Sequence, residues 1–239
     1  MPLILRKCYS NGHSSYNFYY GNVGETVTAP DWNPKPKCGN GLHGLLEGNG
    51  DWLLLTGDDW LVIEADKEDI VEIDNYKCKF RTGKILFRGS KEELAKSEFP
   101  NKLNLNSNAA YCWTRDIGNH DIMMHKITDS KYAYYWAREF GYHNIMINKI
   151  TESEWAYYWA LYIGNKDVMI HKVTDPCWIY EWARNIGNHD VMMHKITNSY
   201  WAYWWARNIG NSDVMKPKIT DSEYIKIWNL AFPDNTIIT

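Results

Sequence analysis

The sequence has little net charge, few cysteines and no long hydrophobic run, and each shortage excludes a class of protein. Its 26 Lys and Arg residues nearly balance 29 Asp and Glu residues, so a polycation that binds nucleic acid or a membrane surface is not indicated. No stretch approaches the roughly 18 apolar residues of a membrane-spanning helix, and the start, "MPLILRKCYS", lacks the apolar length of a secretion signal. The sequence therefore predicts a soluble, cytoplasmic protein with no membrane partner.

Cysteine is also scarce, which argues against a disulfide framework. The five cysteines are odd in number and widely separated: Cys8, Cys38, Cys78, Cys112 and Cys177. A chain of 239 residues with 45% apolar residues can build a core without covalent links. We therefore expect reduced thiols.

Aromatic residues are abundant, and they show that the second half of the chain is a repeat. Beyond residue 106 lie 10 of the 13 Trp and 12 of the 17 Tyr residues. Aligning this half with itself places one Trp in every copy at steps of 23 residues, at Trp113, Trp136, Trp159, Trp182, Trp205 and Trp228. The sequence therefore contains five full copies and a partial sixth.

Each copy is predicted to be a helix, a turn and a second, short helix. In the third copy, "ITESEWAYYWALYIGNKDVMIHK", Thr151 stands where a helix N-cap is needed and Glu154 follows at capping-box spacing. Gly164 is placed to end the first helix, and Asp167 to cap the second. An isolated 23-residue pair cannot bury its apolar stripe, so residues 107–239 are predicted to stack as an α-helical solenoid whose last, more polar copy is a cap.

The first half of the sequence predicts a different kind of structure. Short β-branched or aromatic runs such as "LILRKCY", "DWLVIEAD" and "KILFRG" are separated by Gly, Asn, Asp and Pro, which is typical of a small sheet. A capped helix is predicted from Ser90. The predicted fold is therefore α+β, with a β-rich head at 1–100, a linker at 101–106 and the repeats at 107–239.

One stretch of the head, "KCGNGLHG", matches the glycine pattern of dinucleotide-binding loops through Gly39, Gly41 and Gly44. Such a loop needs a strand before the first glycine and a long helix after the last one. Here Pro34 and Pro36 precede the glycines, and "LLEGNGDW" breaks any helix after three residues. We therefore predict neither a dinucleotide site nor any other cofactor.

Two C-x4-H segments in the head offer a metal site as an alternative. They contain Cys8 with His13 and Cys38 with His43, a residue set that could bind zinc in a tetrahedral arrangement. The spacing is longer than that of the usual metal hairpin, and buried cysteines with ordinary turn residues explain the same pattern. The prediction is no metal, with this set as the alternative.

The repeats carry three columns of residues that could form a binding surface. The first two are tyrosines with arginines four residues later, which share one flank of each first helix and could either bind a partner or seal one copy against the next: Tyr134, Tyr157, Tyr180, Tyr203, Arg138, Arg184 and Arg207. The third lies opposite the Trp stripe, so its aromatic members are expected to be exposed: Tyr135, Tyr158 and Trp204. An exposed aromatic side chain usually has a partner.

A lysine column raises a further question, because lysines at regular spacing could follow a row of phosphates. The column consists of Lys126, Lys149, Lys172, Lys195 and Lys218. Helix C-termini favour lysine in any case, and this explanation is preferred.

The segments "CGNGLHGLLEG", "WLVIEAD" and "KCKFRTGKILFRG" resemble a poorly characterised N-terminal domain with a Gly-(Leu/Phe)-His motif, found in bacteriophage and bacterial proteins ahead of variable repeats. The resemblance covers about residues 3 to 90. It implies a viral protein that acts in the host cytoplasm and binds a host protein, to inhibit or sequester a defence component.

"GNGLH" also distantly resembles the G-x-G-[IFL]-Y motif of ADP-ribosyltransferases. That resemblance implies a nicotinamide-stacking role for His43, a ribose-binding role for His13 and an acid at Glu64 or Glu72. His43 departs from the tyrosine of the motif.

Taken together, these patterns predict a non-enzymatic interaction protein that binds another protein through its repeats. The alternative is a nucleotide-binding or ADP-ribosyltransferase-like head with a nucleotide ligand. Nucleic acid is not the expected partner, and the sequence leaves self-association open.

Overall fold

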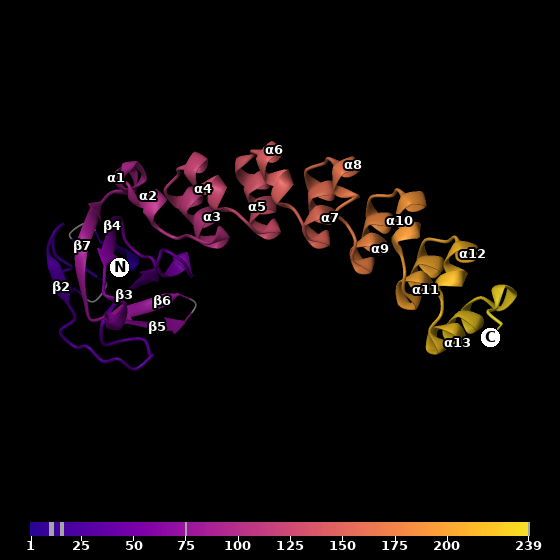
Figure 1. The fold of residues 1–239 in the computed structure, drawn as a ribbon, viewed down its shortest axis with the longest axis horizontal. Helices are drawn as coiled ribbons and strands as arrows, with labels where there is room; N and C mark the ends of the chain where they lie inside the picture. The colour runs from indigo at the N-terminus through magenta and orange to yellow at the C-terminus, as the bar shows by residue number, and fades with distance from the viewer. Residues whose placement is uncertain (10–11, 15–16, 75, 239) are drawn as a thin grey trace. The chain divides into compact units, whose positions relative to one another are not determined.

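The computed structural model describes residues 1–9, 12–14, 17–74 and 76–238, and it has a mixed α+β architecture (Figure 1). The chain forms two compact units, Met1–Thr128 and Asp129–Thr239. Among the described residues, no helix has both the length and the apolar character needed to cross a membrane.

The first unit is built on a curled antiparallel sheet of seven strands (Figure 1). The strands lie in the order β2-β7-β4-β1-β3-β6-β5. Their bounds are β1 Leu3–Cys8, β2 Thr26–Thr28, β3 Leu42–Leu46, β4 Asp59–Glu64, β5 Ile70–Asp74, β6 Lys77–Phe80 and β7 Thr82–Gly89. Ile4, Leu61, Ile63, Phe80 and Ile85 are completely buried in its core, which explains why these apolar runs form strands.

Two short helices follow the sheet, and the segment after them is fixed to the head. Helix α1 (Lys91–Lys96) begins at the predicted cap, because Ser90 and Glu93 form a complete capping box. After α2 (Phe99–Lys102), Leu103 and Leu105 are buried. Asn49 donates to the carbonyl of Asn104 at 2.9 Å and accepts from the N–H of Asn106 at 2.7 Å. Residues 101–106 are therefore firmly bonded to the head.

The first helix pair of the repeat region belongs to the first unit. It consists of α3 (Ser107–Asp116) and α4 (His120–Lys126). Trp113 of α3 packs edge-on against Trp52 of the head, with ring centroids 6.0 Å apart. Within the first unit, the head therefore packs directly against this first pair.

The second unit is a series of helices in which alternate members contact one another. The elements are α5 Ser130–Phe140, α6 His143–Met146, η3 Ile147–Lys149, α7 Ser153–Tyr162, α8 Lys166–Met169, α9 Pro176–Asn185, α10 His189–Lys195, α11 Ser199–Asn208, α12 Ser212–Met215, η4 Lys216–Lys218, α13 Ser222–Ala231 and η5 Pro233–Asn235. The first helices contact in sequence, α5 with α7, α7 with α9, α9 with α11 and α11 with α13 (Figure 1). The Trp at the 23-residue step is completely buried in every copy.

The predicted caps of the repeat helices are wrong by one or two residues. Helix α7 begins after Glu152 instead of Thr151, and α8 begins after Asn165, a left-handed residue with φ 54°. Asp167 therefore lies in the first turn of α8, where its charge still favours the helix dipole. The glycine before Asn165 also has positive φ, 120°, so two consecutive left-handed residues make the turn.

In four copies the threonine instead joins the preceding copy through a serine, at Thr128, Thr151, Thr174 and Thr220. The N–H of Thr151 donates to Ser130 Oγ at 2.9 Å, and the N–H of Glu152 donates to the same oxygen at 3.2 Å. Ser199 accepts equivalent bonds from residues 220 and 221. Pro176 occupies the serine position of its copy and has no hydroxyl, so this bond cannot form there.

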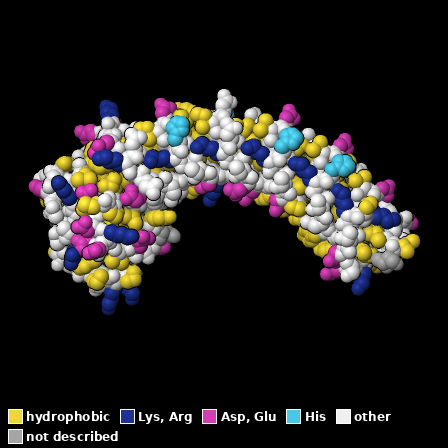
Figure 2. Space-filling view, viewed as in Figure 1, with side chains coloured by type: hydrophobic (Ala, Val, Ile, Leu, Met, Phe, Trp, Pro, Cys, Tyr) yellow, Lys and Arg dark blue, Asp and Glu magenta, His cyan; other side chains and the backbone are white. Residues whose placement is uncertain are grey.

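The lysine column caps the preceding copy. Lys172 Nζ donates to the carbonyl of Ile150 at 2.6 Å, and Lys218 Nζ donates to the carbonyls of Met193 and Ile196 at 2.6 and 2.7 Å. Figure 2 shows Lys and Arg side chains recurring along the second unit. Burial lowers the pKa of four column members, Lys126, Lys149, Lys195 and Lys218. The ammonium groups of Lys126, Lys172, Lys195 and Lys218 bond to carbonyls of the preceding segment, so the structure gives a different reason for the column than the end of the lysine's own helix.

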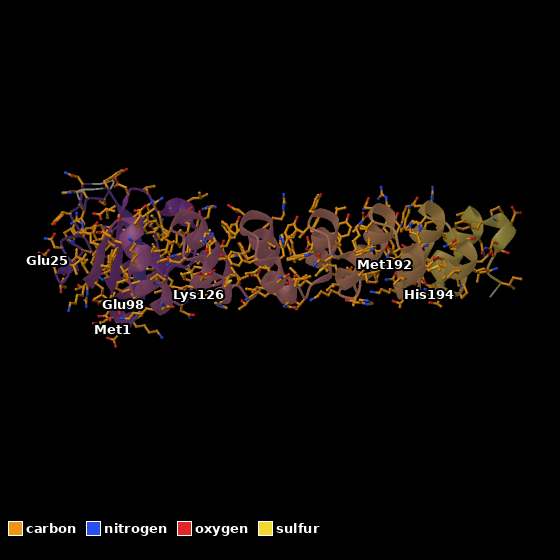
Figure 3. All side chains as sticks on the ribbon, turned by 90° about the horizontal axis from the view of Figure 1, so that it is seen from above. Met1, Glu25, Glu98, Lys126, Met192 and His194 are labelled. Atoms are coloured by element: carbon orange, nitrogen blue, oxygen red, sulfur yellow. The ribbon has the colours of Figure 1, made fainter. Side chains whose placement is uncertain are left out.

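The second helix of a pair also has a buried face and an exposed face. On α10 the side chain of Met192 is completely buried, whereas His194 is exposed (Figure 3). The exposed histidines therefore lie outside the core formed by the Trp and Met columns.

Candidate functional site

Two parts of the structure have the features of a binding site, one in each unit. The first is a group of aromatic side chains on the first helices of the second unit. The second is a cavity in the head.

The aromatic side chains form two groups of rings in contact, which together we call the aromatic band. In its first segment Tyr135 lies 5.6 Å from Trp155, Trp155 lies 5.7 Å from Tyr158, and Tyr158 lies 5.5 Å from Trp178, measured between ring centroids. All four side chains are half-buried. The aromatic band is defined as Tyr135, Trp155, Tyr158 and Trp178 with the second segment, Tyr200, Trp201, Trp204 and Tyr224.

The second segment is held together in the same way. Tyr200 lies 4.8 Å from Trp201, 6.4 Å from Trp204 and 5.8 Å from Tyr224. Tyr200 is 44% exposed. Glu181 occupies the position between Tyr158 and Trp204 in the column, so an acidic side chain separates the two segments along that column.

The predicted column of Tyr135, Tyr158 and Trp204 is thus partly exposed, but sequence reasoning missed its neighbours. Trp155, Trp178 and Trp201 recur at the same 23-residue step, and they supply most of the contacts in the band. The sequence signal that could have revealed these residues is the Trp that three successive copies share at this position.

The other predicted column lies beneath the band. Tyr134, Tyr157, Tyr180 and Tyr203 are each at most 6% exposed. Tyr157 and Tyr180 accept hydrogen bonds from the amides of Asn185 and Asn208 in the next copy, at 3.0 and 2.8 Å. Tyr157 and Tyr180 therefore join successive copies, as expected if this column seals one copy against the next and does not bind a partner.

The arginines of the same flank remain at the surface. Arg138 and Arg207 donate to the hydroxyls of Tyr134 and Tyr203 at 3.2 and 2.7 Å. Arg184 instead lies 3.7 Å from Glu181. All three arginines are exposed, so they form the edge of the aromatic band.

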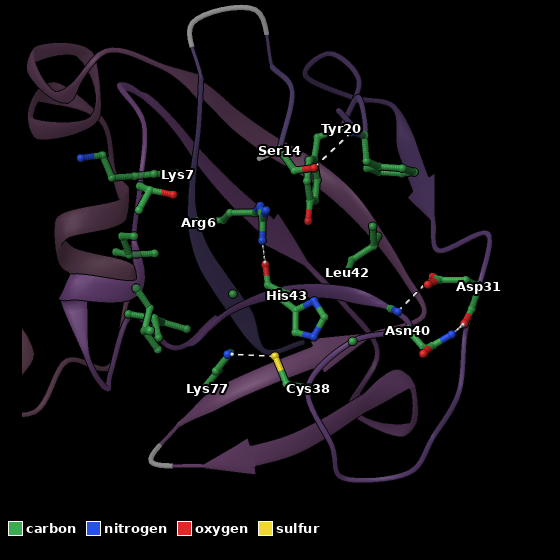
Figure 4. Close-up of a pocket in the computed structure, with 18 of the residues that line it drawn as sticks. Arg6, Lys7, Ser14, Tyr20, Asp31, Cys38, Asn40, Leu42, His43 and Lys77 are labelled. Atoms are coloured by element: carbon green, nitrogen blue, oxygen red, sulfur yellow. Dashed lines mark hydrogen bonds between the residues drawn. The ribbon is translucent and has the colours of Figure 1, made fainter. Parts of the chain in front are cut away.

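The cavity in the head has a volume of about 630 Å³ and combines apolar walls with cationic groups (Figure 4). Arg6 comes from β1, His43 from β3 and Lys77 from β6. These strands are neighbours, because β3 pairs with both β1 and β6. Phe18 and Leu42 line the apolar part.

His43 is the member of the cavity whose chemistry is most altered. Its Nε2 atom is buried without a hydrogen-bond partner among the described residues. Burial, followed by the positive charges of Arg6, Lys77 and Lys79, lowers the pKa of His43 to about 4. The imidazole is therefore neutral at pH 7.

Arg6 is held in place beside His43. Its Nη1 donates to the backbone carbonyl of His43, and its guanidinium carbon lies 4.4 Å from the ring centre of Tyr20 (Figure 4). Burial raises the pKa of Tyr20 to about 12, so its hydroxyl stays protonated. Among the described residues no carboxylate lies within ion-pair distance of Arg6.

The structure does not bring the other predicted head residues into this cavity. His13 packs against Tyr19 at 5.1 Å between ring centroids, Glu64 ends β4 and Glu72 lies in β5, and none of the three is among the lining residues.

The alternative metal ligands are also separated. Cys8 is buried in the core of the sheet, whereas Cys38 is exposed and accepts a bond from Lys77 Nζ at 3.3 Å. Within the described ranges, no three His, Cys, Asp or Glu side chains form a cluster suited to a metal ion.

The perturbed pKa of His43 gives a prediction for stability as a function of pH. Because the folded protein holds His43 neutral, its contribution is complete above pH 6.5 and is lost as the pH falls towards 4. Allowing for its partial exposure, we expect acidification to cost the wild type about 1 to 2 kcal/mol more than a His43→Gln variant. Urea unfolding at several pH values measures this difference, and parallel pH profiles would refute it.

The glycine stretch that precedes His43 leads into a strand. Gly44 lies within β3, so the segment has no helix to receive a pyrophosphate. The resemblances to a bacteriophage domain and to ADP-ribosyltransferases have no independent support and stay predictions. A comparison with known proteins finds no matching family model, no matching curated protein and no matching solved structure.

Proposed function

We propose that the chain is a non-enzymatic protein-binding module, in which residues 107–239 form an α-helical solenoid and the aromatic band is the binding surface. The observation that carries the proposal is the band itself, with partly exposed Trp or Tyr rings in contact across consecutive copies. A host protein is the partner that the bacteriophage resemblance implies, and inhibition or sequestration of a defence component is the role that would follow.

The composition of the band supports binding to a protein. Trp and Tyr are enriched among the residues that dominate protein–protein affinity. The rings are mounted on helices whose buried Trp residues fix their position, so a partner need not order them. Little conformational entropy is therefore lost when a partner binds.

The charge at the band is mixed, because exposed Arg138, Arg184 and Arg207 lie at its edge and Arg184 lies 3.7 Å from Glu181. Burial, followed by the negative charge of Glu154 and, more weakly, that of Glu181, raises the pKa of Tyr158, so both carboxylates act on this ring. A surface that carries both signs of charge suits a partner segment with charged residues of both signs. We therefore expect a peptide segment with apolar and charged residues, and not nucleic acid, because the net charge of -3 does not favour a polyanion.

Selection from a library of random linear peptides on the full chain tests this proposal. We expect the selected peptides to be rich in apolar residues, with charged residues of either sign. The double variant Trp155→Ala with Trp178→Ala should weaken the best peptide by at least about tenfold, since each ring is a candidate hot spot. Fluorescence anisotropy with the labelled peptide measures the dissociation constants.

The matched control is Val168→Ala, an exposed position on the second helix of the same copy as Trp155. It should bind the peptide with unchanged affinity. Equal losses for Val168→Ala and the double variant would refute the band as the surface. So would binding of a mixed-sequence single-stranded DNA as tight as that of the best peptide.

A further inference from the structure

We propose that the cavity between β1, β3 and β6 of the head binds a small phosphate monoester that carries an apolar ring. This site lies wholly in the first unit and is independent of the aromatic band. Its essential groups are Arg6 and Lys77.

The charge of the cavity favours a dianion. Three cations, Arg6, Lys7 and Lys77, are among the lining residues, against one carboxylate, Asp31. That carboxylate is also engaged, since it accepts the N–H of Gly41 at 3.1 Å (Figure 4). The site therefore holds excess positive charge that a phosphate monoester can neutralise and that a neutral ligand leaves uncompensated.

Arg6 and Lys77 approach the cavity from opposite sides of His43 (Figure 4). Arg6 is oriented by the His43 carbonyl and the Tyr20 ring, and Lys77 Nζ lies 3.3 Å from Cys38 Sγ at an exposed edge. A phosphate held between these two side chains would meet two cations.

The walls of the cavity are already formed without a ligand. Lys79, only 1% exposed, donates to the carbonyls of Lys37 and Gly39 at 3.0 and 3.4 Å. The same loop is fixed from its other end by Asn40, which donates to the carbonyl of Asp31 at 3.1 Å. A preformed cavity of about 630 Å³ with apolar lining has the size of a small-molecule site.

The first test compares three ligands that share one ring: naphthyl phosphate, naphthoate and naphthol. Titration calorimetry on the full chain should give the tightest binding for the phosphate, at least about tenfold tighter than for naphthol. Lys77→Gln should weaken naphthyl phosphate by about tenfold, whereas Lys84→Gln should not change it. Lys84 is an exposed lysine of β7 outside the cavity.

Equal affinities for naphthyl phosphate and naphthol would overturn the proposal, and so would equal losses in the two lysine variants. Circular dichroism checks that each variant is folded.

A second measurement needs no variant, because Cys38 is exposed and lines the cavity. Naphthyl phosphate should slow the reaction of Cys38 with a neutral maleimide, as read by peptide mass spectrometry. The half-buried Cys177, in the second unit, is the internal control. Unchanged labelling of Cys38 at saturating ligand would also overturn the proposal.

Discussion

Replacing Trp182 with alanine is expected to lower the free energy of unfolding of the second unit by about 3 to 5 kcal/mol. The ring is completely buried on α9, which contacts both α7 and α11. Its removal leaves a cavity beside a helix that packs on two neighbouring helices. Urea unfolding followed by circular dichroism measures the loss.

Two further variants separate the cost of this cavity from the effects of losing the indole N–H and of losing any Trp on this helix. Trp182→Phe should cost less than alanine, because the indole N–H of Trp182 is buried without a partner among the described residues and phenylalanine removes it. Trp178→Ala, on the same helix but half-buried, should also cost less. A Trp182→Ala loss below about 1 kcal/mol would show that neighbouring copies do not depend on this ring.

The repeat could be predicted from sequence because its main signal is local and periodic. A buried Trp every 23 residues, with glycine after the first helix, is sufficient to place helices and turns. The caps were misplaced because Thr151 lies next to the true cap, Glu152, and its N–H bonds to Ser130 of the preceding copy. A contact between copies cannot be distinguished from a local cap on the basis of residue type alone.

The candidate sites were predictable only in part, because they too depend on contacts between segments that are distant in the sequence. The half-exposed column was found by its angular position on a helix, which periodicity determines. The cavity, however, depends on strand pairing, since Leu42–Leu45 of β3 lie opposite β6 and His43 faces Lys79 in register. His43 was singled out from its motif, but its cationic partners Arg6 and Lys77 follow only from the order of strands in the sheet.

Replacing Gly57 with alanine is the second substitution expected to have a large effect, at about 2 to 5 kcal/mol of unfolding free energy. Gly57 has φ 113°, and a Cβ there would lie 2.0 Å from the carbonyl oxygen of Cys8. That obstacle is backbone, at the end of β1, and the neighbouring Asp58 N–H bonds to the same oxygen at 2.9 Å. The turn at Gly57 and Asp58 cannot move away from β1 without breaking this bond.

Gly24→Ala is the matched control, because Gly24 also has positive φ, 89°, but has open space where a Cβ would lie. It should cost only the backbone strain, about 1 kcal/mol. Residues 54–56, just before Gly57, form part of the cavity wall, so Gly57→Ala should also weaken naphthyl phosphate binding while Gly24→Ala leaves it intact. Equal unfolding free energies for the two variants would show that the close approach to Cys8 does not determine this turn.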